Sequence, residues 1–474
     1  MNVPNVGTYY SKHIDVWKDI YENNPPWEMV NRSGLAPKKE QRKISKLNVA
    51  KVLCDAFSDL TFSEQCEITI DSKPYQTYVN DVLESNDFWN NIPELISSAY
   101  ALGGGCIKVY ADNSEPRLNY IHADRFFPSE WTGKTITGGI FQSSTMHKNY
   151  YYTLCELYTK GNVENKLFKS KTIDDIGISC PLSELYTDVA ENVKYNDVNV
   201  PMFAYFKPCV SNNAEYETPL GMSIYANAID TLKALDITFD SFAREVVLGK
   251  KRIIVPSTAV QTVVEPLTGE VKRYFDADDE VFTALSVEDK ENLQIVDNSA
   301  TLRISEHVQA INALLNILCF QVGLSAGSLS FDAIQGMKTA TEVISQDSKT
   351  ARTIKSNKNL LVEMFEDVVH AIIALGVALG QIPKTEYTVT IGFKDNIIID
   401  DNTLIDNNIK LVGAGLKSKI SAIMEVLKCD EETAQEELER ITQEQSVTGL
   451  AVDDLMGNNE GGGTDDETGD NAGK

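Results

Sequence analysis

Two long amphipathic segments in the middle of the chain limit its possible folds more than any other feature. In the first, apolar residues recur with a period close to 3.6 after Pro219 until Gly249, at Ile224, Ala228, Leu232, Leu235, Phe239, Phe242 and Val246. The second runs from Ile304 to Val322 and closes at Gly323 in the same way. The pattern predicts two helices, the first of about 28 residues or about 42 Å.

The segment between these helices, residues 250–300, is expected to be rich in β-structure. Strand-like runs cover residues 252–255, 270–275 and 293–296, with a turn at 267–269. Most helical hairpins close with a short loop, so two helices that carry a β module between their far ends are an uncommon arrangement. We expect this module to project away from the main body.

The part of the chain before these helices is expected to be a mixed α+β region. Residues 1–60 look helical around a Pro25-Pro26 break, whereas short β-rich runs separated by Gly, Asn and Pro turns extend from Phe62 to Pro208. A basic segment, Arg32 to Lys51, holds seven Lys or Arg residues against one acid. We interpret it as a solvated helix face, with a contact to DNA or to an acidic neighbour as the alternative.

After the second helix the pattern changes at a Gly/Ser-rich loop, Ser325 to Lys338. A very long helical pattern follows from about Thr339 to Gly380, polar in its first half and apolar in its second, so its two ends should face different environments. A strand and two further helices are expected at residues 387–393, 402–427 and 430–445. Residues 457–474 contain almost nothing to bury and should be disordered.

The overall charge argues against a protein that captures nucleic acid on a broad basic face. The chain has 43 basic and 69 acidic residues, a formal net charge of −26. One local exception is the segment from Lys338 to Lys358, which has a net charge of +3. Its two acids are Glu342 and Asp347, and its five bases are Lys338, Lys349, Arg352, Lys355 and Lys358. On a helix, the first three of these bases fall within about 60° of one another. A solvated face would explain the pattern equally well, but the adjacent glycine-rich loop favours a contact with DNA.

The cysteines and the apolar stretches indicate a reduced protein without a membrane partner. The eight cysteines are scattered with no C-x-x-C pair, which is typical of a cytosolic protein, and we expect all of them to be buried as small hydrophobes. The most apolar stretch, Val368 to Gly380, is interrupted by His370 and is shorter than the roughly 18 to 20 residues that span a bilayer. We expect it to be a core helix.

No motif nominates a catalyst, a metal site or a cofactor. Gly133-Lys134-Thr135 resembles the end of a phosphate-binding loop, but Pro128 stands where the upstream glycine belongs, so a β-turn is favoured. Gly103 to Gly105 follows a helical pattern and precedes a strand, which fits a helix terminator. His122-Ala123-Asp124 lacks a visible third ligand, so we expect a structural histidine. Asp278-Asp279-Glu280 is interpreted as a solvated turn.

The order of these parts resembles that of phage portal proteins, of the siphovirus type common in phages of Gram-positive hosts. The resemblance covers nearly the whole chain and rests on the order and spacing of several segments. These are Ile14-x-x-Trp17-x-x-x-Tyr21 with Pro26-Trp27, residues 121–128, Gly323-Leu324-Ser325, Lys338-Thr339-Ala340-Thr341-Glu342-Val343, and the acidic C-terminal helix. The family's motor ATPase is a separate protein, which agrees with the missing phosphate-binding loop.

The resemblance implies a portal-type α+β fold whose parts can be placed on this sequence. The implied parts, in chain order, are an N-terminal wing region (1–215), a first stem helix (216–249), a clip (250–300), a second stem helix (301–324), a tunnel loop (325–338), a long kinked helix with a wing strand (339–400), a helical crown (401–446) and a disordered acidic tail (447–474). The clip would meet the packaging motor and later the neck proteins.

The resemblance also implies the partners and a site. The chain would form a ring, usually of about twelve subunits, because head-to-tail contacts close when the rotation allows. Its partners would be double-stranded DNA in the channel, the terminase motor, head-completion proteins, and the major capsid and scaffolding proteins in the virion, after assembly in the host cytoplasm. Candidate channel residues are Ser325, Ser328, Ser330, Gly336, Lys338, Lys349 and Arg352. The alternatives are a nucleotide-handling enzyme around Gly133-Lys134-Thr135, and a scaffold protein with no DNA path.

Overall fold

The computed structural model divides the chain into two compact units, Met1–Lys394 and Asp395–Lys474. Within them it describes residues 9–31, 41–62, 66–173, 175–215, 217–249, 252–254, 261–264, 271–274, 296–298, 301–331, 348–393, 401–427, 429 and 431–442. The expected acidic turn at Asp278-Asp279-Glu280 and the expected disordered tail lie outside these residues.

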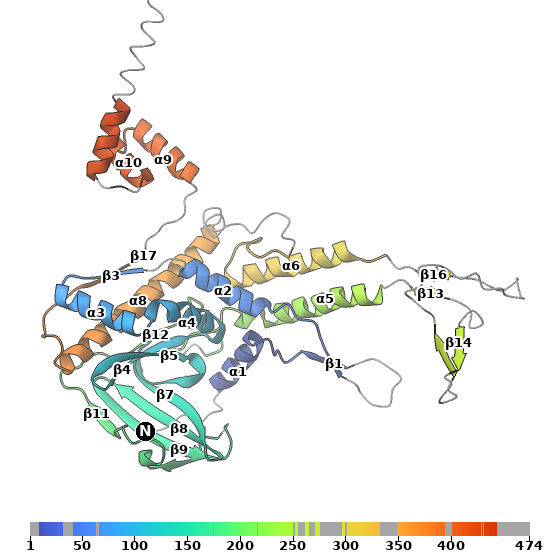
Figure 1. Cartoon of the computed structure of the whole chain (residues 1–474), viewed down its shortest axis with the longest axis horizontal. Helices are drawn as coiled ribbons and strands as arrows, with labels where there is room; N and C mark the ends of the chain where they lie inside the picture. The colour runs from blue at the N-terminus through green and yellow to red at the C-terminus, as the bar shows by residue number, and fades with distance from the viewer. Residues whose placement is uncertain are drawn as a thin grey trace, which may run out of the picture. The chain divides into compact units, whose positions relative to one another are not determined.

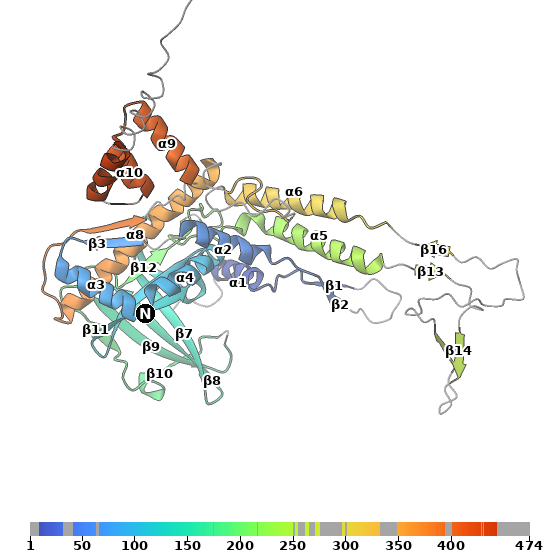
Figure 2. The same ribbon diagram turned by 45° about the horizontal axis from the view of Figure 1, so that its top comes forward.

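Helices cover one face of a three-stranded antiparallel sheet in the first unit (Figure 2). The sheet has the order β12 (Phe203–Phe206), β4 (Gly105–Asp112), β5 (Glu115–His122). Helices α4 (Phe88–Leu102) and α8 (Ser348–Ala378) contact the sheet. Helices α2 (Val49–Thr61) and α3 (Lys73–Ser85) pack against these two, with α1 (Tyr9–Tyr21) beside α4. The second half of α8 is buried, including Val368, Val369, Ile372 and Leu375, so the apolar stretch is a core helix as predicted.

A larger antiparallel sheet lies against the other face of the three-stranded sheet. Its order is β10 (Ile178–Cys180), β9 (Asn162–Ser170), β8 (Tyr150–Thr159), β7 (Thr135–His147), β6 (Phe126–Thr132), and β11 (Asn192–Lys194) also pairs with β9. Aromatic rings fill the space between the sheets. The centre of the Phe203 ring lies 5.6 Å from the centre of the Phe126 ring and 5.6 Å from that of the Phe141 ring. Lys108 is buried here and donates to Glu156 at 2.6 Å, so one ion pair links the two sheets.

A separate two-stranded sheet joins β3 (Cys66–Ile70) to β17 (Val389–Phe393), two segments more than 300 residues apart. The strand expected near residues 387–393 is therefore present. The outer edge of β3 is occupied by a side chain, because the Ile70 amide donates to Gln76 Oε1 at 2.7 Å and Gln76 Nε2 donates to the Ile68 carbonyl at 3.0 Å. The Gln76 amide thus takes the place of a neighbouring strand.

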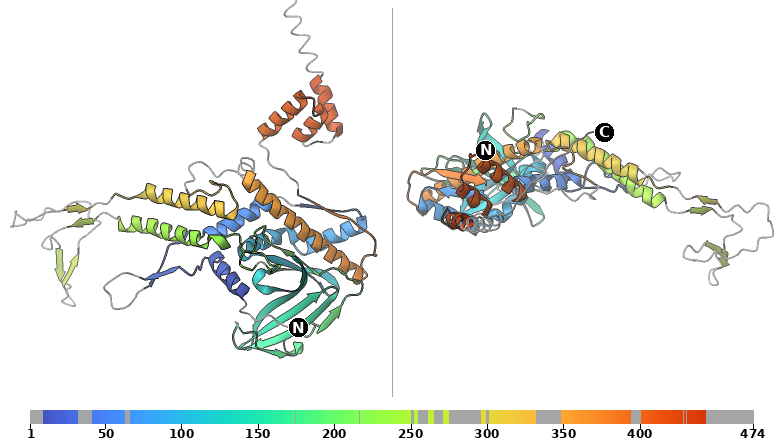
Figure 3. Two further views of the ribbon diagram at one scale, coloured as in Figure 1. Left: turned by 180° about the vertical axis from the view of Figure 1, so that it is seen from behind. Right: turned by 90° about the horizontal axis from the view of Figure 1, so that it is seen from above.

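Two long antiparallel helices, α5 (Ile229–Leu248) and α6 (Ile304–Val322), lie side by side in the views of Figures 1 and 3. Gly323 ends α6 with a φ of 87°, as the sequence predicts. Two small antiparallel sheets lie between them in the sequence: β13 (Arg252–Ile254) with β16 (Val296–Asn298), and β14 (Gln261–Val264) with β15 (Val271–Tyr274). The segment between the helices therefore contains β-structure.

The first long helix begins later than the apolar pattern suggests, at Ile229 rather than near Pro219. Residues 219–225 are not helical because the end of α4 holds them in place: the Ile224 amide donates to the Tyr100 carbonyl at 3.0 Å, and the Met222 backbone lies where a side chain on Gly103 would be. Ile224 and Tyr225 are buried by this extended segment. Apolar side chains at helical spacing were therefore a misleading signal here.

The described part of the N-terminal basic segment departs from the expected helix: residues 41–43 form a strand, 44–48 have no regular structure, and only 49–51 are helical, as the start of α2. Strands β1 (Met29–Asn31) and β2 (Gln41–Lys43) pair, and α5 holds the hairpin and the chain around it through two carboxylates one turn apart. Asp236 accepts from Trp27 Nε1 at 2.9 Å and from the Leu47 amide at 3.1 Å. Asp240 accepts both Nη atoms of Arg42, at 2.8 and 2.5 Å. We call the described residues of this stretch, 23–31 and 41–48, the N-terminal strap.

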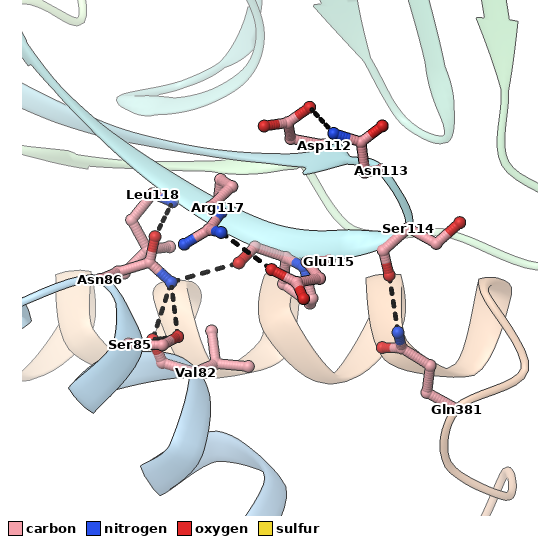
Figure 4. Close-up of polar contacts among 11 residues, drawn as sticks. Val82, Ser85, Asn86, Asp112, Asn113, Ser114, Glu115, Arg117, Leu118 and Gln381 are labelled. Atoms are coloured by element: carbon pink, nitrogen blue, oxygen red, sulfur yellow. Dashed lines mark hydrogen bonds and ion pairs between the residues drawn. The ribbon is translucent and has the colours of Figure 1, made fainter.

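Polar side chains also tie the three-stranded sheet to the helices around it (Figure 4). Asn86, after α3, donates to the carbonyls of Val82 and Pro116 at 2.8 and 3.2 Å and accepts from the Leu118 amide at 3.0 Å. Gln381, after α8, donates to the Ser114 carbonyl at 2.6 Å. Strand β5 and the turn before it are thus fixed to the ends of two helices.

The second unit consists of short helices, α9 (Asp401–Gly413), α10 (Lys419–Leu427) and a helix at residues 431–442. The single helix expected at 402–427 is broken because Gly415 has a φ of 70°, and Ser418 then accepts from the Ser421 amide at 3.1 Å as an N-cap.

The cysteine prediction was correct in part. All eight are free, and Cys54, Cys66, Cys106, Cys155 and Cys319 are buried, but Cys180 and Cys429 are partly exposed and Cys209 is exposed. Burial raises the pKa of the Cys66 thiol to about 12. No helix among the described residues is long and apolar enough to cross a membrane.

Candidate functional site

The described part of the Gly/Ser-rich loop after α6 is held in place by side chains of the helix. Its backbone is held by two asparagines on α6, four residues apart. The Gly327 amide donates to Asn316 Oδ1 at 2.7 Å, and the Phe331 amide donates to Asn312 Oδ1 at 2.8 Å. Residues 323–331 therefore run back along α6, and we call them the loop strap.

The end of the loop strap is packed between aromatic rings. The Phe331 ring lies 6.3 Å from that of Phe239 and 6.2 Å from that of Phe242, both on α5. Phe242 also lies 5.9 Å from the His307 ring on α6. The strap thus contacts both long helices, and its position depends on their mutual packing.

The start of the loop strap is fixed to the first turns of α8 by buried hydroxyls. The Ser325 amide donates to Thr350 Oγ1 at 3.0 Å, and Thr350 donates to Ser325 Oγ at 3.1 Å. One turn later, Thr353 donates to the Gly323 carbonyl at 2.8 Å. The end of α6, the beginning of the strap and the beginning of α8 therefore form one rigid joint.

Lys349 forms an additional contact between α8 and α6. Its Nζ donates to the Phe320 carbonyl at 3.0 Å and lies 4.3 Å from the centre of the Phe320 ring. A cation near the last carbonyls of a helix is favourable because those groups carry partial negative charge. The ring itself remains 73% exposed.

The structure places the predicted channel residues in different environments. Ser325 is buried and its hydroxyl is bonded, so it supports the loop rather than presenting its hydroxyl at a surface. Ser328 and Lys349 are half-buried, whereas Ser330 and Arg352 are exposed. Gly336 and Lys338 lie outside the described residues. Lys355 is exposed three residues beyond Arg352, so α8 presents two basic side chains beside the joint.

Sequence reasoning missed the side chains that hold the loop. Asn312 and Asn316 lie four residues apart in the second amphipathic segment. Thr350 and Thr353 lie three residues apart after the loop. Residues three or four apart lie on one side of a helix, and both pairs carry groups that bond to backbone. That spacing was the available signal.

The four described bases of the N-terminal basic segment are all ion-paired. Arg42 pairs with Asp240 at 2.5 Å, Lys43 and Lys46 pair with Glu28 at 3.3 and 3.1 Å, and Lys51 pairs with Asp55 at 2.5 Å. The hydrogen bond from Arg42 lowers the pKa of Asp240, and burial raises the pKa of Asp236. Arg42, Lys43 and Lys46 therefore stabilise the strap, whereas the Lys51 pair lies within α2.

The motifs considered for chemistry have structural roles. Gly133 and Lys134 form the turn between β6 and β7, and Lys134 Nζ donates to the Thr218 carbonyl at 2.7 Å. Gly103 ends α4 with a φ of 85°. His122 Nδ1 lies 2.8 Å from Ser98 Oγ, and Asp124 pairs with Lys18 at 2.7 Å. Among the described residues no group of three or more His, Cys, Asp or Glu could hold a metal ion.

The outer side of α6 carries an exposed apolar stripe next to the joint. Ala313, Ile317 and Phe320 follow at helical spacing, with Ile317 49% and Phe320 73% exposed. The core side of the same helix buries Ile311, Leu315, Leu318 and Val322. Helix α6 is therefore apolar on two sides, and its packing against α5 accounts for one of them.

One family model matches nearly the whole chain. The model of the family described as "Phage portal protein, SPP1 Gp6-like" matches residues 3–448. No curated protein matches the chain. Among solved structures, 85 chains match. One comes from the "Virion of native gene transfer agent (GTA) particle"; it is 10% identical, with a TM-score of 0.39 over 80% of this chain and 88% of that chain.

Proposed function

The chain belongs to the SPP1 Gp6-like family of phage portal proteins, and we propose that its copies surround a channel for double-stranded DNA. As a portal subunit it is a structural component of a phage particle, not an enzyme, and it assembles as an oligomeric ring. We further propose a ring of about twelve subunits, closed by head-to-tail contacts.

The observation that carries the channel proposal is the joint between α6, the loop strap and α8. A rigid joint fixes where the rest of the loop starts, and it sets the exposed bases Arg352 and Lys355 beside that starting point. Every neutralised phosphate adds to affinity, so a conduit should be acidic overall with few bases along its path. A chain with a net charge of −26 and this local basic group fits that requirement.

We propose the division of the subunit that the resemblance to portal proteins implies. Helices α5 and α6 are the stem, residues 250–300 the clip, residues 325–338 the tunnel loop, and residues 401–446 the crown. In this arrangement the clip meets the terminase motor and then the head-completion proteins, and the body contacts capsid and scaffolding proteins. We also propose a siphovirus of a Gram-positive host as the source of the particle.

We propose that the exposed stripe on α6 is the contact with the neighbouring stem. Apolar surface that one hairpin cannot cover is expected to be buried by another copy. Phe320→Asp should therefore leave the subunit folded but unassembled, and light scattering should detect the loss of rings. Rings that form normally from this variant would show that the contact between subunits lies elsewhere.

The channel is tested by measuring assembly and packaging together. We would compare Lys338→Ala, Arg352→Ala and Gly336→Pro with Lys160→Ala, a control at an exposed lysine in the β8–β9 turn. Ring yield is measured by electron microscopy and packaged DNA by nuclease protection. We expect normal rings but altered packaging for all three variants. For Arg352→Ala the subunit should stay folded because an exposed charge typically contributes less than about 0.5 kcal/mol to stability.

Lys349→Ala belongs in a separate class, because Lys349 also holds α8 against α6. A packaging defect from this variant alone would report on the joint rather than on phosphate contact. Normal packaging in all the loop variants would remove the loop from the DNA path and favour the alternative of a scaffold protein.

A further inference from the structure

The described residues of the C-terminal unit form helices with almost no buried side chains. Among the described side chains of residues 395–474, only Asn408 and Ala434 are buried, and α10 buries none. Helices α9 and α10 have 13 and 9 residues. Isolated helices this short are marginal in water and derive their stability from packing of an apolar face. Something outside the unit's own described core must therefore supply that packing.

The uncovered apolar residues lie on the first two helices of the unit and the turn between them. Ile409 is 63%, Leu416 78% and Leu427 56% exposed, and Ile405, one helical turn before Ile409, is also exposed. Single exposed apolar residues are common on protein surfaces, but several on three short elements are typical of an interface. The unit thus carries an interaction surface, which we call the α9–α10 face.

Charge separates this face from the third helix of the unit. Exposed Lys410 and Lys419 border the α9–α10 face, and the charge of exposed Glu425 on α10 is neutralised by its ion pair with Lys417. The helix at residues 431–442 has one base, Arg440, and its acids are Glu431, Glu432, Glu436, Glu437 and Glu439. The unit therefore has two unlike surfaces, one apolar with a basic rim and one acidic. A head-to-tail contact between copies joins two unlike surfaces of this kind.

We propose that the α9–α10 face of one copy is covered by the C-terminal unit of the next copy in the ring. The lysine rim of one copy pairs with the acidic helix of its neighbour, around an apolar centre that includes Ile409. This rests on the proposed function, because it takes the ring as given. The C-terminal unit then completes its core only on assembly, so that its folding and ring closure are coupled.

Hydrogen exchange measured by mass spectrometry on rings of the full chain tests the contact. In wild-type rings the amides of α9 and α10 should exchange at least about tenfold more slowly than in rings of Ile409→Asp, because local opening sets the exchange rate. The matched control is Ile178→Asp, which alters an equally exposed isoleucine, 74% accessible, on β10 of the first unit. That control should leave exchange in α9 and α10 unchanged.

Charge reversal identifies the partner surface. Lys410→Glu with Lys419→Glu should speed the exchange of α9 and α10, and Glu432→Lys with Glu436→Lys should do the same. All four changes in one chain restore opposite charges around the ring and should recover slow exchange. Failure of the fourfold variant to recover would overturn the head-to-tail pairing.

Two further outcomes separate this inference from the proposed function. Unassembled Phe320→Asp subunits with α9 and α10 as slowly exchanging as in rings would show that the chain covers this face itself, and would reject the inference. Rings with rapid exchange in α9 and α10 would reject it as well, while leaving the ring intact as a finding. Failure of the wild-type chain to form any ring would instead count against the proposed function.

Discussion

Helices α5 and α6 each hold a second stretch of chain through two polar side chains one turn apart, but they use different chemistry. Helix α5 holds the N-terminal strap with Asp236 and Asp240, and one of the bonds is a bidentate ion pair with Arg42. Helix α6 holds the loop strap with the neutral amides of Asn312 and Asn316. Charge-assisted hydrogen bonds are roughly twice as strong as neutral ones.

The difference indicates which strap can leave its helix. A buried carboxylate that loses its partner is costly, so the N-terminal strap is a permanent part of the body. A neutral hydrogen bond contributes only about 1 kcal/mol net, and water can replace it once the loop is exposed. We therefore expect the loop strap to detach under conditions in which the N-terminal strap does not.

The largest expected effect comes from removing the ion pair of the N-terminal strap. Asp240→Ala leaves Arg42 without its partner in a partly buried position and should lower the free energy of unfolding by about 3 kcal/mol. Chemical denaturation of the subunit measures it. Glu115→Ala is the control, because it breaks an exposed ion pair with Arg117 and should change the same quantity by less than about 1 kcal/mol.

A smaller effect is expected at the aromatic end of the loop strap. Phe331→Ala removes the ring contacts with Phe239 and Phe242 and should destabilise the strap by about 2 kcal/mol, less than for a fully buried ring. Limited proteolysis should then cut within residues 323–331. Resistance equal to wild type would show that the ring does not hold the strap.

Asn316→Ala should have a still smaller effect, about 1 kcal/mol, because it removes one neutral acceptor. The expected result is faster hydrogen exchange at Gly327 without a measurable change in the melting temperature of the body. A drop in melting temperature like that of Asp240→Ala would contradict the contrast between the two straps.

The smallest expected effect is the pH dependence of the N-terminal strap, because its two carboxylates oppose each other. The pKa of Asp240 is lowered from its ordinary value of 3.8, so its stabilisation is present above that pH and is lost as the pH falls through the folded-state pKa. The pKa of Asp236 is raised by burial, so the strap gains stability as the pH falls through that value. The net change between pH 6 and pH 3 should be small.

Single variants separate these two contributions. Asp240→Asn should flatten the loss below about pH 4, and Asp236→Asn should remove the gain above it. Denaturation midpoints measured across this range provide the comparison. The loop strap is held by amides, so its exchange rates, corrected for intrinsic pH dependence, should not change with either variant.

The sequence predicted the elements whose signals are local. The end of α6 at Gly323, the end of α4 at Gly103 and the apolar half of α8 all follow from periodicity and terminating glycines. The predicted start of α5 was wrong because tertiary contacts overrode the periodicity. The Ile224 amide donates to the carbonyl of Tyr100, 124 residues earlier in the chain. No window of sequence contains that partner.

The candidate site was predictable in position but not in detail. Gly/Ser content correctly marked a loop after α6, but it did not indicate that Asn312, Asn316 and Thr350 hold the backbone of that loop. Similarly, the seven bases of the segment from Arg32 to Lys51 suggested a solvated helix or a DNA contact. The described bases instead pair with acids, and one of these acids, Asp240, lies far along the chain. A cluster of basic side chains predicts that acidic partners are needed, but only the fold determines which carboxylates become those partners.

The Gln76 side chain has a consequence for how subunits avoid the wrong polymer. A subunit that must meet its own copies can also meet them through sheet edges, and such contacts grow without limit because no rotation closes them. The Gln76 amide already occupies the donor of Ile70 and the acceptor of Ile68 on the edge of β3. An incoming strand cannot form hydrogen bonds with these two groups, so fibre growth from this edge is slowed. Assembly into closed rings is then favoured over assembly into open filaments.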